Sequence, residues 1–189
     1  MTSRHIAVLL TAALAIGASG ATAVGAPPTA SAASYTIRTS GFSVSRIGAF
    51  RPRGDGTIAA ARRVFGAPSS KRLTSDNDCQ VEWRRLGLRI SFSNFGVNPG
   101  QTTCSESVGL GQWFTARGRR FRTSRGLRPL ARSSAVLQHH PGADFRRGSW
   151  WLVTAVSPYG EGGESPVIRA IVGGGRVRAL AGYIGAAGE

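Results

Sequence analysis

Acidic residues and lysine are scarce in this chain of 189 residues. Nine acidic residues face 24 basic ones, for a formal net charge of +15, and Lys71 is the single lysine. So few carboxylates leave little material for general acid–base catalysis, and none of the common hydrolase, metalloprotease or phosphate-loop motifs is present. We therefore expect a protein that is not an enzyme, with a small hydrolase as the alternative. The positive charge favours anionic partners.

Cysteine is also rare, since Cys79 and Cys104 are the only two. The amino-terminal residues described in the next paragraph predict export, and in an exported protein an isolated pair of cysteines usually forms a disulfide. Such a bond stabilises the folded state by about 3 kcal/mol according to the chain-entropy estimate. Two buried free thiols are the alternative. No C-x-x-C is present, and His139 and His140 are the only histidines after His5. A cationic cap at a helix end is the favoured role for that pair, so we predict neither a metal site nor a cofactor.

Long apolar runs are absent apart from one at the amino terminus. Residues 6–20 are almost wholly apolar or small, but a membrane-spanning helix needs about 20 such residues. Arg4 precedes the run, and Ala30-Ser31-Ala32 follows it as a small-x-small cleavage site. This order predicts a signal peptide over residues 1–33. A membrane anchor is the weaker alternative, so we expect a secreted or extracytoplasmic protein that spans no membrane after cleavage.

The clearest local signal predicts a helix over residues 57–65. Ile58, Ala61 and Phe65 recur on one helical face, and Gly66 suits the left-handed position after a helix. Either of two side chains, Asp55 or Thr57, can cap its start. A second helix is expected over 131–139, with Val136 and Leu137 turned inward.

Alternating apolar and polar residues predict strands elsewhere. The expected strands cover residues 79–83, 88–92, 106–110, 150–156, 166–172 and 176–184. Two hairpin turns are expected, at Arg85-Leu86-Gly87 and at Gly173-Gly174-Gly175. Residues 94–103 and 157–165 are expected to be loops, and residues 34–45 a flexible lead-in or an edge strand.

The order of helix, Pro/Gly stop, Trp-bearing strand and further strands occurs twice. It predicts an α+β fold, in which two tandem repeats of a short helix followed by antiparallel strands form a curved sheet with helices on one face. The first repeat would cover residues 46–116 and the second 117–189, as one compact unit.

The segment Thr57–Pro68 resembles the helix motif of the SmpA/OmlA and β-lactamase-inhibitor-protein-like fold. In that motif a glycine and a Ser/Thr open a short helix that ends in hydrophobic-Gly-x-Pro. The opening glycine would fall at Asp55, which Gly54 and Gly56 flank. In a looser second copy, Ala131 and Arg132 stand where a polar cap is expected. The resemblance implies tandem helix-plus-sheet repeats that bind other proteins as inhibitors or assembly factors, and it brings no catalytic residues.

Arginines and tryptophans are the candidate binding residues. The arginines crowd into one stretch, namely Arg117, Arg119, Arg120, Arg122, Arg125, Arg128 and Arg132. Guanidinium groups suit phosphate and carboxylate, although a solvated linker is the alternative. Adjacent Trp150 and Trp151 must point to opposite faces of a strand. We expect one of these two to contact a partner.

The sequence thus favours a secreted, non-enzymatic binding module that recognises a protein through a sheet face and loops. The alternative is a cationic protein that binds anionic envelope polymer, lipid or extracellular DNA.

Overall fold

The structure is a computed structural model that describes residues 33–74, 78–93, 104–106, 110–156 and 163–184. Residues 1–32 of the predicted signal peptide, the predicted loop at 94–103 and most of the predicted loop at 157–165 lie outside these residues. No helix among the described residues combines the length and apolar character needed to cross a bilayer.

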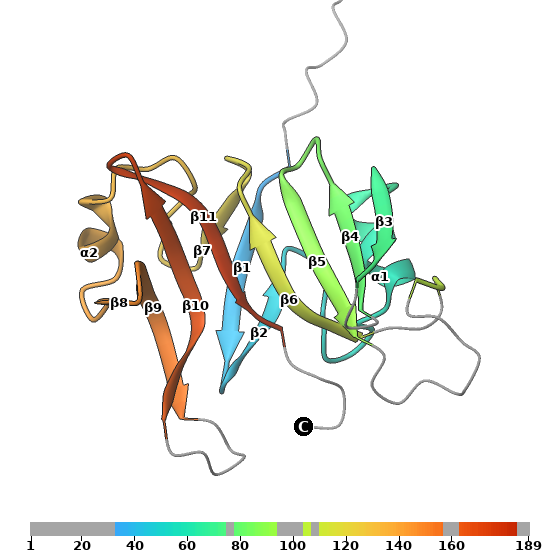
Figure 1. Cartoon of the computed structure of the whole chain (residues 1–189), viewed down its shortest axis with the longest axis horizontal. Coiled ribbons are helices and arrows are strands. Elements are labelled where there is room, and N and C mark those ends of the chain that lie inside the picture. The colour runs from blue at the N-terminus through green and yellow to red at the C-terminus, as the bar shows by residue number, and fades with distance from the viewer. Residues whose placement is uncertain (1–32, 75–77, 94–103, 107–109, 157–162, 185–189) are drawn as a thin grey trace, which may run out of the picture. The chain divides into compact units, whose positions relative to one another are not determined.

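Eight antiparallel strands form the larger of two sheets (Figure 1), in the order β3-β4-β5-β6-β11-β10-β9-β8. Their bounds are β3 Ser70–Leu73, β4 Cys79–Trp83, β5 Leu88–Ser93, β6 Leu110–Ala116, β8 Asp144–Arg146, β9 Ser149–Val156, β10 Glu164–Gly173 and β11 Arg176–Tyr183. The order places β6 beside β11 at the centre of the sheet. That pairing joins chain segments that lie far apart in the sequence.

Hairpins build much of this sheet, as the sequence predicts. β4 pairs with β5, and β10 pairs with β11 across Gly174 and Gly175. Both glycines have positive φ, at 57° and 68°, which a two-residue turn of this kind requires. The predicted strands at 79–83, 88–92, 150–156, 166–172 and 176–184 are therefore confirmed, with small shifts at their ends.

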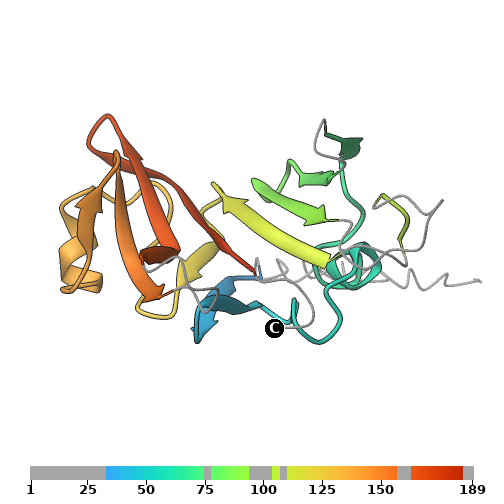
Figure 2. The same cartoon turned by 60° about the horizontal axis from the view of Figure 1, so that its bottom comes forward.

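A smaller sheet covers the inner face of the larger one. It has the order β2-β1-β7, with β1 Tyr35–Ser40, β2 Ser43–Ile47 and β7 Phe121–Thr123, and Figure 2 shows β1 and β2 beneath the large sheet. Ile37, Val44 and Ile47 are fully buried in the same core as the large sheet. The flexible lead-in expected at residues 34–45 is therefore wrong, although β2 does lie at an edge.

Helix α1 spans Ile58–Phe65 and confirms the predicted first helix. The side chain of Thr57 accepts a hydrogen bond from the Ala60 amide, which caps the helix start. Gly66 follows with φ 82°. Ile58, Ala61 and Phe65 are buried, so the predicted apolar face is the face that packs into the core.

The expected α+β class with two helix-plus-strand tandem repeats is wrong. Strands predominate in the described residues, where the only helices are α1, with eight residues, and α2 Ala135–His139, with five. One continuous eight-stranded antiparallel sheet dominates, and the layer against its inner face includes a second sheet. The fold is mostly β.

The second helix is shorter than predicted because residues 131–133 pair elsewhere. The Ala131 carbonyl accepts a hydrogen bond from the Val177 amide, and Ser133 donates to the Gly175 carbonyl. Leu130, the residue before the predicted start, has φ 69°, which no helix accommodates. Of the two residues expected to point inward, Val136 is buried, whereas Leu137 is 47% exposed.

The strand predicted at residues 106–110 falls largely outside the described residues: Glu106 lies in a turn, and β6 has its first described residue at Leu110. Cys104 forms a disulfide with Cys79, as predicted. The Glu106 carbonyl accepts a hydrogen bond from the Ala59 amide, and its carboxylate accepts from Arg62 and Lys71. Residues 104–106 therefore fasten the start of α1 to β4 instead of extending a strand.

His140 anchors α2 to β7 and is not a cationic cap. The imidazole is 3% exposed and shares a hydrogen bond of 2.9 Å with the Thr123 hydroxyl. Burial, with smaller contributions from the charges of Arg125 and His139, lowers the pKa of His140 from 6.5 to about 4. The imidazole is therefore neutral at physiological pH.

His140 should make folding stability depend on pH. Its folded pKa lies below the unfolded value, so the contribution of the neutral ring is complete above about pH 6.5 and is lost as the pH falls toward 4. We expect about 2 kcal/mol less stability from this group at pH 5 than at pH 7.5. Urea unfolding measures it: His140→Gln should flatten the dependence, and an equal slope in both proteins would contradict the assignment.

The disulfide should be a large single contribution to stability. The Cys79→Ala/Cys104→Ala double variant is expected to unfold with about 3 kcal/mol less free energy, because the unfolded chain loses its crosslink. Denaturant titration of the variant and of reduced wild type should give the same loss. Unchanged stability in both would contradict the prediction.

Candidate functional site

The register of the large sheet sets outward side chains in rows. We call the face turned away from β1 and β2 the outer face. In one row Glu82 on β4 pairs with Arg89 on β5, which pairs with Thr115 on β6. The row continues across β11 to Arg169 on β10 and Trp151 on β9. These residues, distant in sequence, therefore share one surface.

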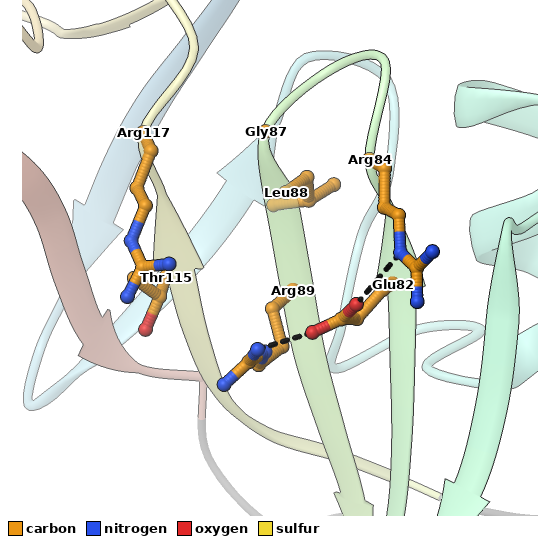
Figure 3. Close-up of a pocket in the computed structure, with 7 residues that line it drawn as sticks. All are labelled: Glu82, Arg84, Gly87, Leu88, Arg89, Thr115 and Arg117. Atoms are coloured by element: carbon orange, nitrogen blue, oxygen red, sulfur yellow. Dashed lines mark hydrogen bonds and ion pairs between the residues drawn. The ribbon is translucent and has the colours of Figure 1, made fainter.

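The first half of this face holds a basic cavity of about 270 Å³ (Figure 3). It is lined by Glu82, Arg84, Gly87, Leu88, Arg89, Thr115 and Arg117. Glu82 lies between two guanidinium groups, with Arg89 hydrogen-bonded to one carboxylate oxygen and Arg84 Nε 3.5 Å from the other. The Arg117 side chain has no hydrogen-bond or ion-pair partner among the described residues, and Figure 3 shows it beside Thr115. We call this the arginine cavity.

Glu82 remains ionised and orients its neighbours. The hydrogen bond from Arg89 is the largest effect and lowers the pKa of Glu82; burial opposes it, and the charge of Arg89 and the contacts with Arg84 lower the pKa further. The carboxylate satisfies only part of the donor capacity of the two guanidinium groups, since each carries five N–H groups. The remaining donors are available to an anion.

Two glycines fix the spacing of the arginine cavity. The Arg117 amide donates to the Gly87 carbonyl at 2.7 Å. A side chain at Gly87 would lie 2.8 Å from the Gly118 nitrogen, and one at Gly118 would collide with the Leu86 carbonyl oxygen. The β4–β5 turn and the end of β6 therefore touch through backbone alone, which holds Arg117 near Arg84.

An aromatic pair lies at the centre of the outer face. Trp113 on β6 is 47% exposed, and its ring centroid lies 5.1 Å from that of Tyr183 on β11. Trp113 also lines a second cavity of about 590 Å³, with Trp151, Arg147, Arg169 and residues of β10. The side chains of Arg147 and Arg169 have no hydrogen-bond or ion-pair partner in the part of the chain that the structure describes. We call this the tryptophan cavity.

Trp150 and Trp151 point to opposite faces, as the sequence predicts. Trp150 packs against the core and meets Phe145 edge to face at 5.3 Å. Trp151 lies on the outer face but is only 7% exposed, because the Arg146 guanidinium covers it at 5.1 Å. Arg146 is in turn held by Asp144 and Glu164.

The predicted arginine cluster does not gather on one surface. Arg117 lines the arginine cavity, whereas Arg122 and Arg125 line a different cavity with Arg38 beside the small sheet. The Arg122 Nε donates to the Thr36 hydroxyl at 3.2 Å. The remaining members are exposed without sharing one of these cavities, namely Arg119, Arg120, Arg128 and Arg132.

Sequence reasoning missed Arg84, Arg89 and Arg169 as site residues. The alternation of residues 79–83 and 88–92 already marks Glu82 and Arg89 as outward neighbours, so the signal for half of the arginine cavity was present. Arg169 carries no such signal, because its place depends on the β6–β11 pairing.

No group of three His, Cys, Asp or Glu side chains that could hold a metal ion occurs among the described residues. Two of the described acids lie apart: Glu82 is on the outer face, and Glu106 pairs with Arg62 and Lys71 near α1.

Comparison with known proteins identifies no relative. The chain matches no family model, no curated protein and no solved structure. The resemblance of residues 57–68 to the SmpA/OmlA and β-lactamase-inhibitor-protein-like motif therefore stays a prediction.

The glycine contact beneath the arginine cavity can be tested directly. Gly118→Ala should destabilise the protein by about 2 kcal/mol, because the new methyl group collides with the Leu86 carbonyl oxygen. Gly142→Ala is the matched control, since nothing lies within 4 Å of a side chain there. Thermal unfolding of both variants tests the prediction. Equal stability of Gly118→Ala and Gly142→Ala would contradict a tight contact between Gly118 and Leu86.

Proposed function

We propose that this protein is a non-enzymatic binding module that recognises an acidic protein through the outer face of its large sheet. The observation that carries the proposal is Trp113, exposed beside Tyr183 at the centre of that face. Tryptophan, tyrosine and arginine are the residues enriched at binding hot spots. Arg117 and Arg169 flank the pair, and their side chains have no hydrogen-bond or ion-pair partners in the described part of the chain.

The electrostatic setting supports an acidic partner. Unpaired arginines on both sides of the aromatic pair would steer an acidic surface toward it and raise the association rate. The aromatic rings would then supply the apolar centre of the interface, and the arginines its charged rim.

Export is part of the proposal. The Cys79–Cys104 disulfide is a crosslink typical of oxidising compartments. Together with the basic, apolar and small residues of the first 33 positions, it supports a secreted protein whose partner lies in the envelope or the medium.

An anionic polymer is the second candidate partner. The net charge of +15 and the arginines of the outer face favour it. Polymer binding through charge alone weakens steeply with salt, whereas an aromatic-centred protein interface depends less on ionic strength.

Capture experiments with paired baits test the proposal. Wild-type protein should retain envelope or medium proteins of the producing cell that Trp113→Ala fails to retain, with affinity reduced at least about 30-fold. Leu137→Ala is the matched control, because Leu137 is equally exposed, at 47%, on α2.

Identical captured proteins with wild type and Trp113→Ala would overturn the outer-face assignment. Binding that disappears between about 0.1 M and 0.5 M salt, and that Trp113→Ala leaves unchanged, would favour the polymer instead.

A further inference from the structure

We propose that the arginine cavity is a specific binding site for a dianionic phosphate or sulfate group. The assignment stands apart from the protein partner proposed above, which is centred on Trp113. It depends on three guanidinium groups, from the β4–β5 turn, from β5 and from the end of β6, that line one cavity with a single carboxylate.

The charge of the cavity matches a dianion. Arg84, Arg89 and Arg117 are permanently cationic, and Glu82 is the one acidic residue in the lining. The surplus of two positive charges equals the charge of a phosphate monoester or a sulfate ion. A single carboxylate would neutralise half of it.

The donors of the cavity are arranged before any ligand arrives. Glu82 lies between Arg84 and Arg89 and contacts one nitrogen of each, so the other N–H groups of both guanidinium groups are not used by it (Figure 3). The Arg117 side chain has no partner among the described residues to release, and Thr115 adds a hydroxyl to the lining. An oxyanion would meet donors from three adjacent strands or their ends, and preorganised donors bind with less ordering cost.

Backbone contacts fix the relative positions of the segments that carry these arginines. The Arg117 amide bonds to Gly87, and neither Gly87 nor Gly118 leaves room for a side chain between the two segments. Exposed arginines elsewhere on the chain, such as Arg85 and Arg128, line none of the described cavities.

Titration with inorganic phosphate, followed by NMR at constant ionic strength and about pH 8, tests the proposal. We expect saturable shifts of the Gly87 and Thr115 amides and of arginine Nε resonances. Arg117→Gln and Arg84→Gln should each weaken binding at least about tenfold. Arg85→Gln and Arg128→Gln remove the same charge outside the cavity and should leave the affinity within about twofold of wild type.

Further ligands distinguish an esterified phosphate from the free ion, and a dianion from a singly charged anion. Sulfate should bind like phosphate, and acetate at least about tenfold more weakly. Glycerol 3-phosphate binding as well as phosphate would indicate an esterified group, whereas binding of inorganic phosphate alone would indicate the free ion.

The proposal is overturned by an absence of saturable shifts, by equal losses in Arg85→Gln and Arg117→Gln, or by acetate binding as tightly as phosphate. Retained backbone spectra of each variant show that a loss of binding is not a loss of fold. Because partner capture depends on Trp113, a failed phosphate titration would leave the proposed function standing.

Discussion

The antiparallel pairing of β6 with β11 is the constraint on which the rest of the structure depends. It sets Leu180 opposite Ala116 and Gly182 opposite Phe114 on the inner face. A side chain at residue 182 would collide with the Val167 carbonyl oxygen and lie 2.8 Å from the Phe114 ring, so the close approach needs glycine. The same register sets Trp113 against Tyr183 on the outer face. One backbone pairing thus unites the two halves of the sheet and assembles the aromatic centre.

Charge is distributed in a way that leaves this face positive. Among the described acids, Asp55, Glu82, Glu106, Asp144 and Glu164 each form an ion pair with arginine or lysine, and Asp78 accepts a hydrogen bond from Ser91. The described acids are therefore already engaged, and the side chains of arginines such as Arg117 and Arg169 pair with no anion among the described residues. The deficit of acids in the composition becomes a local surplus of cations at two cavities.

Local chemistry made part of this fold predictable from sequence. The helix at 57–65 and the turn at Gly174-Gly175 each carry their own signals, a polar cap and glycines with positive φ. The conformation of residues 130–133 is not set by local sequence, because these residues hydrogen-bond to the β10–β11 hairpin. β1 and β7 form a parallel pair although more than half of the described chain lies between them in the sequence. A local sequence pattern cannot predict a strand partner at such a separation. The helical content was overestimated for these reasons.

Some features of the candidate site could likewise be predicted from local sequence, and others depend on tertiary pairing. Opposite orientations of Trp150 and Trp151 follow from strand geometry alone, and so does the outward direction of Glu82 and Arg89. Proximity in sequence was misleading for the arginines, since the chain passes from the large sheet to the small one between Arg117 and Phe121. Which arginines share a cavity is decided by tertiary pairing.

The most direct test of this account is the nuclear Overhauser effect between β6 and β11. The central claim is that these strands pair in the register that sets Trp113 beside Tyr183. It predicts cross-strand backbone contacts between Thr115 and Ala181 and ring contacts between Trp113 and Tyr183. If these contacts were absent from a folded protein, or Trp113 met another residue, the shared outer face would not exist and the account would be wrong.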